Sequence, residues 1–115
     1  MTQKGCLFCR IVEEKKVPFV YEQDLFIVIK DIAPKAPVHL LIIPKIHIEN
    51  LVNISDNDWK LVFDCVRASN ILSKKLKVDS FNLIANNGIK AGQSVFHLHW
   101  HFLSGINIYE NGLTL

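Results

Sequence analysis

His97-Leu98-His99-Trp100-His101-Phe102-Leu103 is the stretch that decides the fold, because histidine alternates with apolar side chains along it. Successive side chains of a β-strand point to opposite faces, so the three histidines would project from one face and the apolar residues between them from the other. Strict alternation of this kind is typical of a strand with one face on the core. The pattern predicts a strand over Val95–Leu103 that presents a row of imidazoles.

Outward from this strand, hydrophobic periodicity predicts the remaining elements. They are a short helix over Leu7–Lys16, a hairpin over Val20–Lys30, a strand over Val38–Ile43, a long helix that begins at Ser55 and ends at Lys77, and a strand over Phe81–Asn87. Prolines in the segment 31–37 and glycines in the segment 88–94 predict loops. No strand–helix–strand unit repeats, as a parallel sheet would need. We therefore expect an α+β fold with an about five-stranded, mostly antiparallel sheet, one long helix and one short helix.

The length and composition of the chain indicate one compact domain. Half of its 115 residues are hydrophobic, and a chain of this length can form one hydrophobic core but is too short for two domains. We expect a single domain over residues 1–115, with a core over about residues 5–105 and a short C-terminal tail over residues 106–115. A domain this small buries only about two-thirds of its unfolded surface, which favours a homodimer. Trp59 and Phe63 on the long helix are candidate contact residues, although the same apolar stripe could be buried within one subunit.

The charge pattern argues against nucleic acid and membrane partners. The formal net charge is +2, and the one tight basic cluster, Lys74, Lys75 and Lys77, lies where cations interact favourably with a helix C-terminus. The longest nearly apolar run, Val38–Pro44, is too short to span a membrane, and His39 interrupts it. We expect no signal peptide, and three cysteines without an export signal favour a reducing, cytoplasmic location.

The histidine row has three possible interpretations: buried structural histidines, a metal site, or a catalytic and binding row. Alternate strand residues lie about 6.5 Å apart, so His97 and His101 would be about 13 Å apart and could not easily share one tetrahedral ion. A row of this length suits an extended ligand better. Neutral imidazole is a nucleophile, and imidazoles with a pKa near neutrality can donate to phosphoryl oxygens, so the row favours nucleotidyl transfer.

Further motifs accompany the row. Asp31-Ile32 precedes the proline-rich loop, His39 lies in the strand after it, Ile43-Pro44-Lys45 closes that strand, and Gly92-Gln93-Ser94-Val95 comes just before the row. With these motifs the chain resembles the histidine-triad (HIT) family, whose signature alternates histidine with apolar residues. Within that family it is similar to the small purine nucleoside phosphoramidases and their bacterial HIT-like relatives. The resemblance spans about residues 5–105 and implies a HIT-like fold.

The resemblance implies a catalytic role for four residues. His99 would be the nucleophile that forms a covalent nucleotidyl-histidine intermediate, which water then hydrolyses. His101 and His39 would hydrogen-bond to the α-phosphate and stabilise its developing charge. Ser94 would offer a hydroxyl near the departing atom. No catalytic metal is required by this mechanism.

The resemblance also implies a nucleotide-binding wall. Asp31 would accept hydrogen bonds from the ribose hydroxyls, and Gly92 would allow the backbone to approach the phosphate closely. Taken singly, both are also ordinary turn residues. The implied nucleotide contacts are Asp31, Ile32, Asn86, Gly92, Gln93, Ser94, His99 and His101.

Cys6-Leu7-Phe8-Cys9 is a separate motif, and by itself it leaves zinc, redox chemistry and a free thiol pair open. Many bacterial relatives that this N-terminus resembles hold a structural zinc. The resemblance implies that its ligands are Cys6, Cys9, His47 and His97. With this assignment, each of the five histidines has a role. Cys65 lies on the apolar face of the long helix, where we expect it to be a core residue.

These observations predict a nucleotide-binding hydrolase or transferase that acts on the α-phosphate of purine nucleotides of the AMP or GMP type. Its specific form would be a purine nucleoside phosphoramidase. The alternative is a nucleotide-sensing adaptor, a regulatory module that binds the same ligand with little catalysis. The intact set of His39, Ser94, His99 and His101 favours the enzyme.

Overall fold

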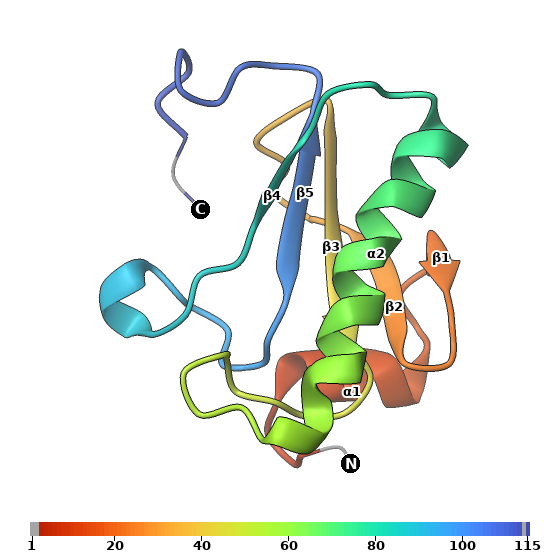
Figure 1. Ribbon diagram of the computed structural model, residues 1–115, viewed down its shortest axis with the longest axis vertical. Helices are drawn as coiled ribbons and strands as arrows, with labels where there is room; N and C mark the ends of the chain where they lie inside the picture. Colours follow the sequence, from red (N-terminus) through yellow and green to blue (C-terminus); the bar gives the residue numbers. More distant parts are fainter. Residues whose placement is uncertain (1–2, 114) are drawn as a thin grey trace.

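The computed structural model describes residues 3–113 and Leu115, and it confirms an α+β fold with one long and one short α-helix (Figure 1). The single five-stranded sheet has the strand order β1-β2-β3-β5-β4. Every neighbouring pair of strands is antiparallel. In chain order the elements are α1 (Leu7–Glu14), β1 (Tyr21–Glu22), β2 (Phe26–Lys30), β3 (Val38–Pro44), the short 3-10 helix η1 (Asp56–Asp58), α2 (Trp59–Leu76), β4 (Asn82–Ile84), the 3-10 helix η2 (Ile89–Ala91) and β5 (Trp100–Ser104).

The sheet separates two apolar layers. On one face α2 packs Leu61, Cys65 and Leu72 against Phe102 and other core residues of β2, β3 and β5, and Cys65 is fully buried as expected. On the opposite face α1 places Phe8 over the alternate residues of β2 and β3. Figure 1 shows α2 running across the front of the sheet, with α1 near its lower end. Among the described residues, no helix is long and apolar enough to cross a membrane.

Only the second half of the segment predicted as a strand, Val95–Leu103, lies in a strand, and this strand is β5. The neighbouring strand β3 ends at Pro44, which has no N–H for a further bond in the ladder. The N–H of Leu98 donates instead to the carbonyl of Ile48, at 2.6 Å. The alternation of faces nevertheless continues beyond the strand. Leu98 lies in the core under α2, while His99 lies on the side of α1.

Other boundaries differ from the sequence prediction for local reasons. α1 ends at Glu14, two residues early, because Lys15 adopts a left-handed conformation with φ of 54°. α2 begins after Ser55, whose side chain caps η1 by accepting from the N–H of Asn57. β4 covers only residues 82–84 of the strand predicted over residues 81–87, and these three residues pair with β5. The hairpin predicted before the proline-rich loop is present as β1 and β2.

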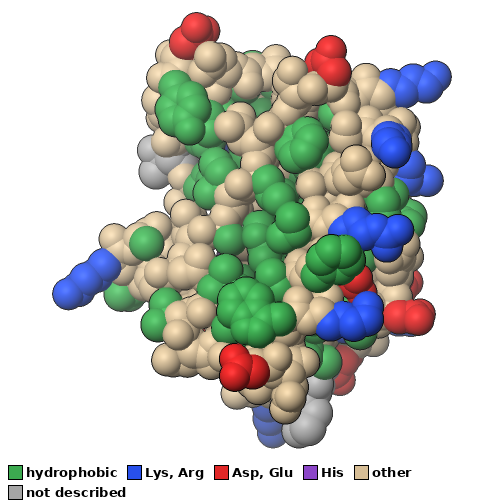
Figure 2. Space-filling model, in the orientation of Figure 1, with side chains coloured by type: hydrophobic (Ala, Val, Ile, Leu, Met, Phe, Trp, Pro, Cys, Tyr) green, Lys and Arg blue, Asp and Glu red, His purple; other side chains and the backbone are tan. Residues whose placement is uncertain are grey.

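The outer face of α2 exposes apolar side chains. Trp59 is 48% exposed, Phe63 64% and Val66 42%. Figure 2 shows hydrophobic side chains gathered in a band over the middle of this side of the molecule. The apolar stripe of the long helix is therefore only partly buried within one chain.

Candidate active site

A cavity of about 300 Å³ opens on the face of the sheet that carries α1, between that helix, the loop after β2 and the loop before β5. Ligand sites for small molecules begin at about this size. The cavity gathers segments that are far apart in the sequence. Every catalytic and nucleotide-binding residue predicted from the sequence lines it: Asp31, Ile32, His39, Asn86, Gly92, Gln93, Ser94, His99 and His101.

A wider groove of about 870 Å³ lies between the residues 77–82 and the residues 103–109. Among the described residues that line it there is neither a histidine nor a cysteine. The side chains that the sequence predicts as the nucleophile and as phosphate ligands converge in the smaller cavity, so the candidate active site lies there and not in the larger groove.

One side of the cavity is apolar and consists largely of residues that no sequence motif assigns to the site. Leu7, Phe8 and Ile11 of α1 line it, and Ile29 of β2 adds to the same side. Their spacing in the sequence indicates a helical stripe, but not what the stripe faces. Ile32 is 99% exposed and also lines the cavity, so a ligand that covered it would bury apolar surface.

Asp31 is held in place by its own loop. Its Oδ1 accepts from the N–H of Ala33 at 2.8 Å, and its Oδ2 lies 3.4 Å from Nε2 of His39. The first contact is typical of an Asx-turn and fixes the direction of the carboxylate. Oδ2 retains the capacity to accept a further hydrogen bond from a hydroxyl in the cavity.

His99 is buried, and its ring is fixed on two sides. Its Nδ1 lies 2.8 Å from the carbonyl oxygen of His97, and the Phe8 ring meets it edge-on at a centroid distance of 5.0 Å. A carbonyl oxygen only accepts, so Nδ1 carries the proton and Nε2 holds the lone pair. Burial lowers the pKa of His99, although the bond to the His97 carbonyl and the charge of Asp31 oppose that shift. The ring is therefore a neutral imidazole, which is the nucleophilic form.

His39 of β3 and His101 of β5 form a pair beside His99. The β3–β5 ladder makes them diagonal neighbours, and Nε2 of His39 lies 2.9 Å from Nδ1 of His101. The His101 ring also meets the His99 ring at 5.1 Å between centroids. Burial is the main cause that lowers the pKa of His101 to about 4, and it lowers the pKa of His39 as well. Both rings are neutral at pH 7, so each offers one donor and one acceptor.

The loop before β5 is held by the buried side chain of Gln93. Its Oε1 accepts from Nδ2 of Asn50 at 3.0 Å and from the N–H of Gly88 at 2.8 Å. Its Nε2 donates to the carbonyl oxygens of Glu49 at 2.8 Å and Val95 at 3.1 Å. Every polar atom of this amide is thus occupied, so the side chain shapes the cavity wall. Asn50 is a supporting residue that no sequence motif indicates.

Gly92 and Ser94 flank Gln93 in the same wall. Gly92 has φ of 92°, in the left-handed region that favours glycine, and it ends η2. Ser94 is exposed and lines the cavity, as does Asn86. Leu115 in the C-terminal tail also lines it, a long-range contact for which the sequence gives no signal.

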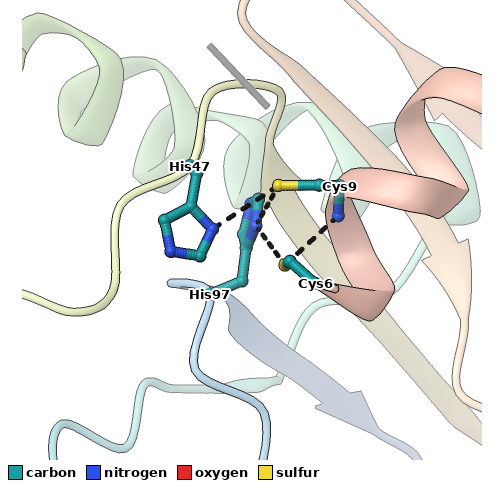
Figure 3. Close-up of side chains that lie close together, drawn as sticks. All are labelled: Cys6, Cys9, His47 and His97. Carbon is teal, nitrogen blue, oxygen red and sulfur yellow. Dashed lines mark hydrogen bonds between the residues drawn. The ribbon is translucent and has the colours of Figure 1, made fainter. Parts of the chain in front are cut away.

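A second cluster contains the Cys-x-x-Cys motif (Figure 3). Cys6 and Cys9 come from the start of α1, His47 from the loop after β3 and His97 from the loop before β5, and their potential ligand atoms all lie within 4.8 Å of one another. Nδ1 of His97 is 3.3 Å from Sγ of Cys6 and 3.4 Å from Sγ of Cys9. Nδ1 of His47 is 3.4 Å from Sγ of Cys9.

The spacing and chemistry of this cluster fit a tetrahedral zinc ion. With Zn–S bonds of about 2.3 Å and Zn–N bonds of about 2.0–2.1 Å, such an ion holds sulfur and nitrogen about 3.6 Å apart, close to the distances above. Nε2 of His97 lies 2.8 Å from the carbonyl oxygen of Pro44, so Nε2 carries the proton and Nδ1 is free for a metal. The four residues predicted as ligands are brought together in an arrangement that suits the ion.

Comparison with known proteins identifies the family. The HIT domain model matches residues 12–108. The chain belongs to the HIT family. An uncharacterized HIT-like protein of Chlamydia trachomatis is 44% identical over 101 residues, which cover 86% of this chain and 91% of the relative.

Solved structures of HIT proteins share the fold of this chain. A HIT family hydrolase from Clostridium thermocellum is 41% identical with a TM-score of 0.87, over 93% of this chain and 96% of the other. A hypothetical histidine triad nucleotide-binding protein from Sulfolobus tokodaii is 35% identical with a TM-score of 0.73, over 85% of this chain and 67% of the other. The HIT fold predicted from the sequence is confirmed, and the chain has the fold of a HIT family hydrolase.

Proposed function

We propose that this HIT protein is a hydrolase that cleaves at the α-phosphorus of purine nucleoside 5′-phosphoryl compounds, with nucleoside phosphoramidates as the substrate class. One observation carries the proposal. The buried His99 keeps the lone pair of Nε2 free, because its Nδ1–H is bonded to a carbonyl at 2.8 Å, and the His39–His101 pair lies against it. A fixed nucleophile beside imidazoles that can bind phosphoryl oxygens suits covalent nucleotidyl transfer.

The cavity offers a place for each part of such a substrate. The apolar side around Phe8 would take the purine ring, with Ile32 covering its edge. Oδ2 of Asp31 would accept from a ribose hydroxyl. The phosphate would then lie against His99 and His101. A cavity of about 300 Å³ suits one nucleoside phosphate unit, with the leaving group directed outward.

In the proposed reaction, Nε2 of His99 attacks the α-phosphorus and the bond from phosphorus to the leaving nitrogen breaks. The leaving amine takes up a proton, for which the exposed Ser94 hydroxyl is the candidate relay to solvent. Positive charge that develops on the His99 ring is stabilised by the carbonyl of His97. Water then attacks the phosphorus and His99 departs, which yields a nucleoside monophosphate. The proton that the water loses replaces the one taken by the amine.

The test is turnover of the purified protein with adenosine and guanosine 5′-phosphoramidates, a diadenosine polyphosphate and a nucleotide sugar. Release of nucleoside monophosphate is measured for each. We expect the phosphoramidates to be cleaved fastest, and we expect added magnesium to have no effect because no catalytic metal is required. Tight nucleotide binding without turnover of any of these compounds would contradict the proposal and favour the nucleotide-sensing adaptor.

We propose in addition that Cys6, Cys9, His47 and His97 hold a structural zinc ion. Two imidazole nitrogens face the two sulfurs, and this arrangement favours zinc over a redox dithiol, which needs no such partners. All four tetrahedral positions would be taken by protein ligands, as is typical of structural sites. The ion would tie the start of α1 to the loops that flank the cavity.

We also propose that a second copy of this chain covers the outer face of α2. Trp59, Phe63 and Val66 are spaced four and three residues apart, so they form one stripe on the helix surface, and all three are exposed. A two-fold axis beside this stripe would bury it on both chains at once. The additional buried apolar surface would stabilise a domain of this small size.

A further inference from the structure

The peptide N–H of Lys35 lies at the far end of the histidine pair and has no part in the reaction described above. It donates to Nδ1 of His39 at 3.0 Å. Lys35 lies in the loop between β2 and β3, where Pro34 and Pro37 restrict the backbone on either side of it. A backbone donor in a restrained loop is thus aimed at a buried ring of the candidate active site.

This one contact decides where the protons of both rings reside. A ring nitrogen that accepts a hydrogen bond carries no proton, and a neutral imidazole has only one proton, so His39 must carry its proton on Nε2. Nε2 lies 2.9 Å from Nδ1 of His101, so His39 donates and His101 accepts. The proton of His101 then lies on its own Nε2. Asp31 supports the same assignment, because its Oδ2 lies 3.4 Å from Nε2 of His39 and a carboxylate accepts.

We propose that the Lys35 N–H is a positioning donor, which fixes the tautomers of His39 and His101 so that Nε2–H of His101 is presented to the phosphoryl oxygens of the substrate. This inference rests on the proposed function. Without that N–H, His39 could hold its proton on Nδ1 and accept from Nδ1–H of His101. Nε2 of His101 would then present a lone pair to the anionic oxygens, and the pair would repel the phosphate that it should bind.

The contact between the Lys35 N–H and His39 also disfavours the binding of a cation by His39 and His101. Potential ligand atoms of Asp31, His39 and His101 lie within 4.8 Å of one another. A cation at Nε2 of His39 would require the ring proton on Nδ1, where the Lys35 N–H already points. The donor therefore favours phosphate over a metal ion at this position.

The charged and titratable groups around His39 come from the loop after β2 and from the segment that contains β5. Asp31 and Lys35 lie in the loop after β2, and His101 lies on β5 with His99 next to it. Burial lowers the pKa of His39; the charge of Asp31 opposes that shift, and the Lys35 ammonium adds to it. The Lys35 N–H acts in the same direction as burial, because a second proton on the ring would have to point at it.

The experiment reads the tautomers directly. Long-range proton–nitrogen correlation NMR distinguishes the two neutral tautomers of each ring, and the chain has five histidines to assign. In the wild-type protein at neutral pH we expect Nε2–H at both His39 and His101. Lys35→Pro removes the N–H, whereas Lys35→Ala removes the ammonium and keeps the N–H. We expect the wild-type tautomers in the alanine variant and a mixture in the proline variant.

Kinetics provide the second readout. We expect kcat of Lys35→Pro to be about tenfold or more below that of Lys35→Ala, with a smaller change in KM, because the His101 donor acts mainly on charge that develops in the transition state. The acid limb of the pH profile of kcat should also lie at higher pH in Lys35→Pro than in Lys35→Ala. Equal kcat values and equal profiles in the two variants would overturn the inference.

The wild-type spectrum keeps the inference testable if Lys35→Pro does not fold. A proton on Nδ1 of His39 in the wild-type protein would overturn it without any variant. Failure of the proposed function has a different signature. If the wild-type protein shows the expected tautomers and cleaves none of the nucleotide substrates, the tautomer assignment is supported and the proposed hydrolase is wrong.

Discussion

His97 and His99 stand two positions apart in one row, yet they present opposite ring nitrogens to their surroundings. His97 donates from Nε2 to the carbonyl of Pro44 at 2.8 Å and directs Nδ1 at the sulfurs of Cys6 and Cys9. His99 donates from Nδ1 to the carbonyl of His97, also at 2.8 Å, and keeps Nε2 free. Backbone acceptors thus divide the row between a thiol–imidazole cluster and a cluster of neutral imidazoles.

The difference shows that residue type alone does not set the chemistry of a histidine in this row. The backbone carbonyl that accepts from each ring determines which ring nitrogen carries the proton and which keeps its lone pair. The groups around the nitrogen with the lone pair then determine what it can bind. The two clusters share His97, whose side chain belongs to the first cluster and whose carbonyl orients the His99 ring in the second. Substitutions that remove one cluster at a time should therefore have separable effects.

Removing the proposed nucleophile should give the largest effect on turnover. In His99→Ala we expect turnover to fall by about 10³-fold or more, because the covalent route is lost. Nucleotide affinity should change by less than about tenfold, since Asp31 and the apolar side of the cavity remain. Turnover of an adenosine phosphoramidate and calorimetric Kd values measure the two quantities. Intact-mass spectra should show an acid-labile nucleotidyl adduct on the wild type and none on the variant.

His99→Gly is the matched control for this loss. The space left by the ring admits free imidazole, which should restore part of the rate if the missing group is a nucleophile. Turnover near the wild-type level in His99→Ala, with phosphoramidates, the polyphosphate and the nucleotide sugar alike, would show that the row serves binding alone.

Removing the thiol–imidazole cluster should act mainly on stability. We expect about one zinc per chain by elemental analysis of the wild type and little in Cys9→Ser. The variant should melt on the order of 10 °C lower, because metal that binds only the native state adds to the free energy of unfolding. Cys65→Ala is the control, since this buried thiol lies outside the cluster and its loss should leave the zinc content unchanged. Zinc-free protein purified without chelators would contradict the proposal.

The pH dependence of kcat tests whether the imidazoles of His39 and His101 are neutral. Burial lowers the pKa of His101 to about 4 and also lowers the pKa of His39, whereas an ordinary histidine titrates near about 6.5. The neutral rings should persist as the pH falls, so kcat should stay level from about pH 7.5 to about pH 5.5 and decline toward about pH 4. An acid limb near the ordinary histidine pKa would contradict this description. Zinc content measured at each pH separates titration of the rings from loss of the metal.

Stability should change with pH in the same direction. Because the pKa of His101 is lower in the folded chain than in the unfolded chain, the unfolded state binds more protons between the two values. The contribution of His101 to the free energy of unfolding is therefore complete above about pH 6.5 and decreases as the pH falls toward about 4. Urea midpoints at several pH values for the wild type and His101→Gln measure this contribution, and equal slopes in the two proteins would contradict it.

The sequence predicts the residues of the cavity better than it predicts where the strands end. The alternation of the row and the short motifs around Asp31 and Gly92 are local signals, and every residue predicted from them to contact a nucleotide lines one cavity. The start of β5 is not a local property, because it depends on Pro44 in the neighbouring strand. No pattern within the segment 95–103 contains that information.

The remaining features of the site arise from contacts between distant segments. Phe8 reaches His99 because α1 packs across the sheet, a contact that helical spacing does not reveal. The side-chain amide of Gln93 has all its polar atoms hydrogen-bonded, and one of the donors to it is Asn50, which lies on another loop. The Lys35 donor is a backbone group and has no side-chain signal at all. Packing and backbone geometry therefore supply what the motifs omit.

The outer face of α2 lies on the other side of the sheet from both clusters, so it should affect turnover least. Light scattering at micromolar concentration should give twice the chain mass of 13.1 kDa for the wild type and a single chain mass for Phe63→Glu, because a buried charge opposes the contact. The variant should keep kcat within about threefold of the wild type, since Phe63 and the cavity lie on opposite faces of the sheet.

Ile89→Glu is the matched control for this last substitution. Ile89 is 74% exposed, and it lies on η2, which projects to the side away from α2 in Figure 1. The same apolar-to-acidic change there should leave the dimer intact, so a difference between the two variants would locate the contact on α2. A wild-type monomer at micromolar concentration would contradict the dimer. A dimer that survives Phe63→Glu would instead place the contact on another face, and the exposed stripe of α2 would need a different occupant.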